Sequence, residues 1–276
     1  MIKELIIKIF RNLLYPHKIP VKIKNKIIYY YYFKKYNLDL FVKEQNNIFN
    51  SLGLQRERGL KHVNFIKKQL GKNFETNKMS SEHEVIISSL SLSKNQSFKN
   101  ILEIGTYDGL NACLLSNLFS NSNIDTIDLP DNDEDFINFY GRKNKISDFV
   151  RNRNNILDQN KNINFIQINS LKLLNYKKKY DLIWIDGAHG YPNVCIDIIN
   201  SLKILNDNGV ILCDDITKNL NQSDSDRMYS SIASYETLNA LKKEKLIDYN
   251  LIYKRLDVFY NCIKSKRKFI AFVKKL

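Results

Sequence analysis

Residues 101–109 read ILEIGTYDG, an apolar run that meets an acid and then two glycines four residues apart. The apolar part predicts a buried strand, and residues 110–119 have the spacing of a helix. Gly105 and Gly109 allow a tight turn and a close approach of a ligand. A strand, a glycine turn and a helix in this order are typical of a nucleotide-type site. The dinucleotide fingerprint requires one more glycine where this chain has Tyr107, which disfavours a plain NAD site.

Further apolar runs alternate with helical patterns along the rest of the chain, which predicts a parallel sheet flanked by helices. We expect parallel strands over residues 100–104, 123–129, 163–168, 180–185 and 209–213. Two last runs, residues 251–261 and 268–274, are separated by a polar segment and predict an antiparallel hairpin. The expected fold class is therefore α/β, with a Rossmann-like, doubly wound, mostly parallel seven-stranded sheet that ends in an antiparallel hairpin.

The N-terminal part has a different pattern. Helical spacing dominates residues 40–70, and a helix capped by Ser80 or Ser81 is expected before the first strand. Residues 16–26 carry two prolines and predict a linker or an edge strand. The aromatic run IIYYYYF at residues 27–33 predicts a strand or a buried helix, in preference to a surface that stacks nucleic-acid bases. The expected domains are a mainly helical appendage, residues 1–78, and a second domain, residues 79–276.

Residues 1–14 predict a basic amphipathic helix. Such a helix can lie on an anionic membrane surface as a peripheral anchor, but docking on its own domain or on a partner subunit, as in a homo-oligomer, is favoured. Charged residues interrupt its apolar positions, so it lacks the continuous core of a signal peptide or membrane span. A cytoplasmic location is therefore expected.

The composition constrains the partners only loosely. The 276 residues carry 43 Lys and Arg against 29 Asp and Glu, a net charge of +14. A clustered excess would favour nucleic acid, an anionic membrane or acidic ligands. The chain is also rich in Asn, Ile and Tyr, whose codons are AT-rich like those of Lys, so part of the charge reflects codon usage. The cysteines lack metal-binding spacing and are expected as reduced thiols: Cys113, Cys195, Cys213 and Cys262.

Acidic residues follow three of the predicted strands. Asp128 ends the second strand and suits a carboxylate that binds ribose hydroxyls. Asp186 ends the fourth strand, and Asp214 and Asp215 end the fifth. Crowding the last three carboxylates without a cation would be costly, whereas Mg²⁺ or another hard divalent ion binds such oxygens readily. The sequence therefore predicts a metal site at Asp186, Asp214 and Asp215.

The sequence of residues 103–109, EIGTYDG, resembles the first motif of the class I S-adenosylmethionine-dependent methyltransferases. It is most similar to the branch that contains the catechol, caffeoyl-coenzyme A and macrocin-type sugar O-methyltransferases. The resemblance extends over residues 80–276 and implies S-adenosylmethionine as the cofactor. The cofactor-binding residues that it implies are Glu103, Gly105, Thr106, Tyr107, Gly109, Asn111, Asp128, Asn169, Ser170 and Asp186.

The resemblance also extends to the metal site and to a catalytic base. Related metal-dependent enzymes have an acid at the end of the fourth strand and an acidic pair at the end of the fifth. The catechol-type enzymes place a lysine base three residues after the first acid, where this chain has His189. The sugar-modifying branch often has an aspartate two residues after that acid, where this chain has Ala188. Histidine has a reference pKa of about 6.5, which suits proton removal near neutrality.

The implied reaction is methyl transfer to an oxygen, with Asp186 and His189 as the catalytic residues. In an alternative interpretation, His189 only binds a loop carbonyl and Asp215 only caps a helix. Residues 130–162 form a long polar insertion at the carboxyl side of a strand. They are expected either to form a lid or substrate wall, or to be a solvated helical segment.

Two other functions remain open. A metal-independent nucleic-acid methyltransferase would account for the positive charge, but the sequence lacks the motifs of exocyclic-amine and cytosine methylation. A non-catalytic module would bind the cofactor without turnover and recruit a partner through its appendage. A small-molecule, sugar or glycoconjugate hydroxyl is the preferred acceptor, and this preference rests on the resemblance alone.

Overall fold

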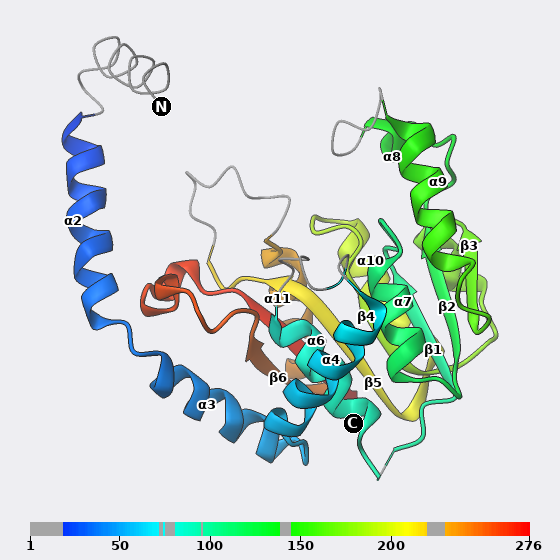
Figure 1. The fold of residues 1–276 in the computed structure, drawn as a ribbon, viewed down its shortest axis with the longest axis horizontal. Coiled ribbons are helices and arrows are strands. Elements are labelled where there is room, and N and C mark those ends of the chain that lie inside the picture. The colour runs from blue at the N-terminus through cyan, green and yellow to red at the C-terminus, as the bar shows by residue number, and fades with distance from the viewer. Residues whose placement is uncertain (1–18, 72–73, 75–80, 95, 139–144, 220–229) are drawn as a thin grey trace.

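The structure is a computed structural model that describes residues 19–71, 74, 81–94, 96–138, 145–219 and 230–276. Its centre is a seven-stranded sheet with the order β3-β2-β1-β4-β5-β7-β6 (Figure 1). The strands are β1 (Asn100–Ile104), β2 (Asn123–Asp128), β3 (Ile163–Gln167), β4 (Tyr180–Ile185), β5 (Leu205–Ile216), β6 (Ile247–Tyr253) and β7 (Phe269–Lys275). The pairs within β1 to β5 are parallel, and β7 runs antiparallel between β5 and β6. The predicted fold class is confirmed.

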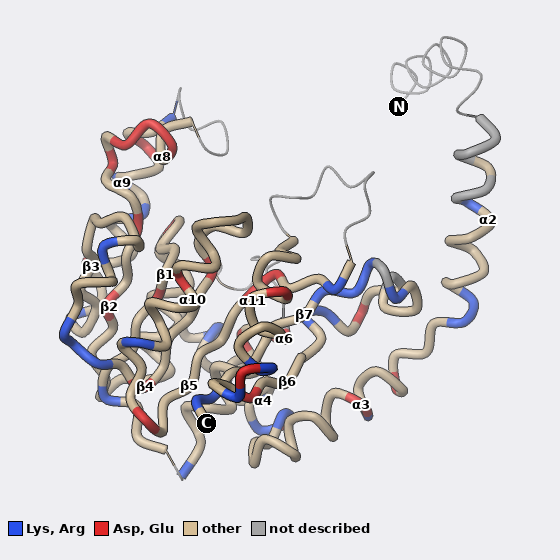
Figure 2. Tube along the Cα trace, turned by 180° about the vertical axis from the view of Figure 1, so that it is seen from behind, with Lys and Arg blue, Asp and Glu red and all other residues tan. Residues whose placement is uncertain are grey.

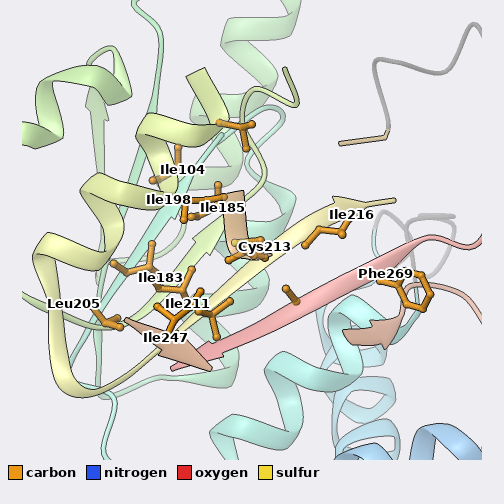
Figure 3. Packing of buried hydrophobic residues seen from close by; sticks show 14 of the residues in the cluster. Ile104, Ile183, Ile185, Ile198, Leu205, Ile211, Cys213, Ile216, Ile247 and Phe269 are labelled. Carbon is orange, nitrogen blue, oxygen red and sulfur yellow. The ribbon is translucent and has the colours of Figure 1, made fainter. Parts of the chain in front are cut away.

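Successive residues of the central strands feed two separate cores because side chains alternate across a sheet. Ile101 of β1 packs with the helices α4 (Arg56–Leu70), α6 (Ser81–Ser91) and α7 (Leu110–Leu118). Its neighbour Leu102 faces the other core, with α10 (Asn193–Ile204) and α11 (Ile232–Lys243). Figure 3 shows part of this second core between β4, β5 and α10. A sheet covered on both faces explains why its strands are almost wholly apolar.

The helices α3 (Leu38–Ser51) and α4 pack against the rest of the chain. Gln45 of α3 is fully buried, and its side chain accepts from the Tyr253 N–H at 3.0 Å and donates to the Glu82 carboxylate at 2.8 Å. Arg56, at the start of α4, forms an ion pair with Glu82. These contacts cross the boundary expected between residues 78 and 79. The division into two domains therefore stays a prediction.

The prediction of a linker or edge strand is wrong for the described residues 19–26, whereas a helix over residues 27–33 was one of the two expected alternatives. The helix α2 (Ile19–Lys35) replaces the linker or edge strand expected up to residue 26 and extends away from the sheet (Figure 1). Several large side chains of α2 are exposed rather than buried, since Ile27 is 64% exposed and Tyr30 is 62% exposed. Its packing partner is a 3-10 turn, where Tyr29 contacts Phe259 with ring centroids 5.9 Å apart. A short apolar run does not by itself distinguish a strand from a helix.

Smaller differences concern strand ends and terminal segments. β5 begins at Leu205, four residues before the expected start, and β6 begins at Ile247 rather than at residue 251. The last residues of the run 251–261, which was expected as the first strand of the hairpin, lie in a 3-10 helix, Phe259–Cys262. The amphipathic helix expected over residues 1–14 lies outside the described residues. Among the helices of the described ranges, none is long and apolar enough to cross a membrane.

Candidate active site

A cavity of about 730 Å³ opens at the carboxyl ends of β1, β2, β4 and β5. Parallel α/β sheets bind their ligands at this edge. The structure brings almost all predicted site residues to the wall of this one cavity: Glu103, Gly105, Thr106, Tyr107, Asn111, Asp128, Asn169, Ser170, Asp186, His189, Asp214 and Asp215. Gly109 is the exception, because it packs against Leu157 of α9 (Ile146–Leu157).

The glycine turn is pressed against the end of β4. Gly105 has a φ of +101°, a conformation that side chains strongly disfavour. A Cβ atom at Gly105 would lie 2.4 Å from the carbonyl oxygen of Asp186. Tyr107 also has a positive φ, and its N–H donates to the Asp128 carboxylate at 2.9 Å. The turn therefore holds the β1, β2 and β4 ends in one tight arrangement at the cavity floor.

Glu103 is fully buried at the end of β1, and burial raises its pKa to about 8. Its carboxylate accepts from the Asn111 amide at 2.6 Å and from the Thr126 hydroxyl. A protonated carboxyl at neutral pH is costly to ionise here unless a cation arrives. Glu103 is therefore suited to bind a cationic group of a ligand.

His83 of α6 also lines the cavity, although the sequence did not predict it as a site residue. Its ring stacks on Trp184 at 4.1 Å between centroids, and burial lowers its pKa to about 4, which keeps it neutral. Its Nε2 lies 2.7 Å from the Asn111 side-chain oxygen, so Nε2 carries the proton. Its Nδ1 is then a buried acceptor, and none of the described residues forms a hydrogen bond with it. His83 comes from α6, the helix before β1, and no sequence motif identifies it as a site residue.

A lysine lies among the acidic side chains at the ends of β4 and β5, and no sequence pattern predicted it. Lys254 directly follows β6 and lines the cavity. Its Nζ lies 2.6 Å from Asp214 Oδ2 and 2.7 Å from Asp215 Oδ1. The only signal in the sequence is one lysine after the apolar run LIY at residues 251–253. The cation that crowded carboxylates require is thus partly provided by the chain itself.

These neighbours shift the titration of the acids in different directions. Burial, followed by the field of Asp214, raises the pKa of Asp186 well above its usual range. Burial also opposes ionisation of Asp214, but Lys254 outweighs it and holds the pKa of Asp214 below its ordinary value. Burial lowers the pKa of His189, which keeps the imidazole neutral at pH 7.

Three side chains of this group could together hold a metal ion. Asp186, His189 and Asp215 each offer one ligand atom, and these atoms lie within 4.8 Å of one another. His189 Nε2 is 3.6 Å from Asp215 Oδ2 and 3.9 Å from Asp186 Oδ1. Two carboxylates and a neutral imidazole fit a divalent cation. Asp214, which was expected as a ligand, directs Oδ2 to Lys254, and its Oδ1 is buried with no hydrogen-bond partner among the residues that the structure describes.

Asn169, Ser170 and Asp197 also line the cavity. The Asn169 side chain accepts from the Leu171 N–H at 3.0 Å and begins the 3-10 helix Ser170–Asn175. Asp197 of α10 is buried, and burial raises its pKa to about 6. Within the described part of the chain, its Oδ1 has no hydrogen-bond partner. An acceptor that is buried without a donor at the wall of a cavity suits a ligand with polar hydrogens.

The insertion expected as a lid or wall does line the cavity through Asp135, Phe136 and Asn138 of α8 (Glu134–Asn138). Arg153 of α9 is fully buried and binds Asp131 at 2.8 Å, which fixes the segment before α8. Figure 2 shows α8 as an acidic segment, whereas Lys and Arg lie on several separate parts of the chain. An acidic wall is unfavourable for a polyanionic substrate.

Comparisons with known proteins agree with this architecture. Residues 102–216 match the family model described as a methyltransferase domain. No curated protein sequence matches the chain. The methyltransferase PaMTH1 of Podospora anserina, solved with S-adenosylhomocysteine, is 17% identical, and the match covers 79% of this chain and 88% of that one with a TM-score of 0.50.

Two further structures are similar to a comparable degree. The O-methyltransferase of Bacillus cereus, also solved with S-adenosylhomocysteine, is 16% identical and has a TM-score of 0.50 over 87% of this chain and 100% of that one. The O-methyltransferase TomG of Streptomyces achromogenes, involved in tomaymycin synthesis and solved with S-adenosylmethionine, is 13% identical, with a TM-score of 0.50 over 84% and 97%. At such identities the similarity establishes the fold.

Proposed function

We propose that this chain, which contains a class I S-adenosylmethionine-dependent methyltransferase domain, methylates a hydroxyl group of a small molecule, most specifically a sugar or glycoconjugate hydroxyl. One observation carries the proposal that the acceptor atom is oxygen. Asp186, His189 and Asp215 converge next to the glycine turn. The combination of acids and a neutral imidazole suits the activation of a hydroxyl, because it can bind a cation and accept a proton.

The cavity offers a complementary group for each part of the cofactor. Glu103 suits the ammonium group of the methionine moiety, because its carboxyl is buried and binding of a cation would favour its ionised form. Asp128 lies at the end of β2 beside the turn and suits the ribose hydroxyls. Asn169 and Ser170 are the candidates for binding the adenine, and Asp197, whose Oδ1 has no hydrogen-bond partner among the described residues, lines the same cavity.

The chain's residues then position the acceptor hydroxyl for an in-line displacement, in which the oxygen–carbon bond forms as the carbon–sulfur bond breaks. A divalent cation held by Asp186, Asp215 and His189 would supply Lewis acidity to that hydroxyl. A cation bound at Nε2 would occupy the lone pair that takes up a proton, so His189 has one of two roles: ligand of the cation, or, as the neutral and only slightly exposed imidazole, acceptor of the released proton. Asp186 orients the imidazole and the hydroxyl from the end of β4.

The test is a transfer assay with methyl-labelled S-adenosylmethionine and separate panels of sugars, glycoconjugates, catechols and RNA. We expect label in a hydroxyl-containing small molecule or glycoconjugate, with the methyl ether located by mass spectrometry, and loss of label in the His189→Asn and Asp186→Asn variants. Label in RNA would favour the nucleic-acid alternative. Cofactor binding without any transfer would favour the non-catalytic module.

A further inference from the structure

Lys254 lies among the acidic side chains of the cavity. Its position leaves room for a metal ion but determines which of the aspartates can be metal ligands. Its Nζ lies 2.6 Å from Asp214 and 2.7 Å from Asp215, and only 9% of the residue is exposed. Its N–H is held at 3.0 Å by the carbonyl of Lys268, so the backbone that carries the side chain is fixed by the start of β7. Lys254 is therefore an integral part of the pocket.

The two acids of the β5 pair are used differently. Asp214 directs Oδ2 to Lys254, and its Oδ1 is buried with no hydrogen-bond partner in the described ranges. Asp215 directs Oδ1 to the same Nζ, while its Oδ2 turns to His189 at 3.6 Å. Asp215 has a φ of +55°, a left-handed conformation that is uncommon for residues other than glycine.

The charges of four side chains, Asp186, Asp214, Asp215 and Lys254, match one divalent cation. Asp186, Asp214 and Asp215 carry three negative charges when ionised, and Lys254 cancels one of them. Two negative charges then remain beside the neutral His189, and the atoms that converge belong to Asp186, His189 and Asp215. Burying the remaining charge without a cation is unfavourable, so one divalent ion would complete the group.

We propose that Lys254 is a built-in cation that withdraws Asp214 from metal coordination and so defines a single divalent-cation position at Asp186, His189 and Asp215. This inference rests on the proposed function, because it concerns the metal of the same site. Lys254 is a positioning residue in this account, since it acts through the two aspartates. A site with an imidazole among its ligands favours Mn²⁺ and similar ions relative to Mg²⁺, which prefers oxygen ligands alone.

Removing the positive charge should strengthen metal binding. In a Lys254→Met variant, the oxygens released from Lys254 are no longer neutralised and attract a divalent ion more strongly. We expect the affinity for Mn²⁺ to rise at least about tenfold, because charges a few ångström apart interact strongly in a partly buried site. Lys254→Arg keeps the charge and should keep the affinity of the unaltered protein.

The decisive comparison uses the double variant Lys254→Met/Asp214→Asn, which removes both members of the neutral pair. We expect it to bind Mn²⁺ within about threefold of the unaltered protein, since the pair contributes no net charge and no ligand. Asp186→Asn should lose Mn²⁺ binding and serves as the matched control for a true ligand. Mn²⁺ binding is measured by the electron paramagnetic resonance signal of the free ion during titration of the full chain.

Two results would overturn the inference. Loss of Mn²⁺ binding in the double variant, to the level of Asp186→Asn, would make Asp214 a ligand. An unchanged or weaker affinity in Lys254→Met, in protein that still binds S-adenosylhomocysteine and is therefore folded, would remove the role of Lys254. Binding of S-adenosylhomocysteine without any Mn²⁺ binding would refute the metal position and leave the methyltransferase activity standing, whereas loss of both would contradict the proposed function itself.

Discussion

Gly105 lies against Asp186 so closely that a Cβ atom on the glycine would be 2.4 Å from the carbonyl oxygen of the aspartate. The contact joins the turn after β1 to the end of β4, and the two strands are direct neighbours in the sheet. The same contact places the acidic group beside the glycine turn. The proposed chemistry needs this proximity, because a methyl donor and an activated hydroxyl must meet within bonding reach.

Gly105→Ala is expected to destabilise the fold and weaken cofactor binding. The substitution combines a steric clash with a φ of +101°, and each effect costs roughly 1–3 kcal/mol. Gly190→Ala is the matched control, since a Cβ there meets nothing within 4 Å and stability should change by no more than about 0.5 kcal/mol. Urea unfolding and S-adenosylhomocysteine titration measure the two effects. Equal stability of both variants would show that the contact is less tight than described.

Glu103→Gln should change how stability depends on pH. Burial raises the pKa of Glu103 to about 8 from an ordinary value of 4.5, so the folded chain keeps a proton that the unfolded chain has released. The free energy of unfolding of the unaltered protein should therefore fall between about pH 4.5 and pH 8, by up to about 1.4 kcal/mol per pH unit. Glu103→Gln should lack this contribution, and denaturant unfolding at pH 5, 6, 7 and 8 compares the two proteins. Parallel curves would refute the buried protonated state.

Gln45→Ala should destabilise the whole chain. The side chain accepts from the Tyr253 N–H and donates to Glu82, and both partners are buried. Leaving these groups unpaired should cost roughly 2–4 kcal/mol. Ser51→Ala removes an exposed hydroxyl of the same helix and is expected to change stability by less than about 0.5 kcal/mol. Thermal unfolding followed by circular dichroism makes the comparison, and separate transitions for α3 and the sheet would argue that the helix is an independent appendage.

His189→Asn should reduce methyl transfer by about 10²–10⁴-fold if His189 is the proton acceptor. Burial lowers the pKa of His189, so the imidazole of the unaltered enzyme stays neutral as pH falls to its ordinary value of 6.5. The rate should therefore decline only below that pH. A pH profile with the acceptor found in the panel assay checks both statements. A variant that retains the rate but loses Mn²⁺ binding would assign His189 to the metal alone.

The sequence predicts the central part of the fold well because strongly patterned strands leave few alternatives. β1 and β4 have the expected bounds, and the glycine turn lies between them. His83 and Lys254 were not predicted, because they reach the cavity from α6 and from the end of β6, where only tertiary packing gives them a role. Tyr30 shows the opposite error, since an aromatic run that favours a strand forms an exposed helix when it finds no sheet to join.

The role of Asp214 shows why a charge pattern identifies a site more readily than its contacts. Crowded acids predict a cation, and the sequence points to a metal ion as that cation. In the structure, Lys254 supplies part of the charge, from a residue that lies forty positions along the chain. Such long-range pairing has no signal in local spacing, so the metal ligands stay a prediction that binding measurements must decide.

Titration calorimetry with S-adenosylmethionine tests the central claim most directly, with the unaltered protein compared with Asp128→Ala. We expect saturable binding with a micromolar dissociation constant and one cofactor per chain, and a loss of about tenfold or more in the variant, because Asp128 is proposed to bind the ribose hydroxyls. Absence of binding by the folded, unaltered protein would contradict the assignment of this cavity to the cofactor and, with it, the proposed methyl transfer.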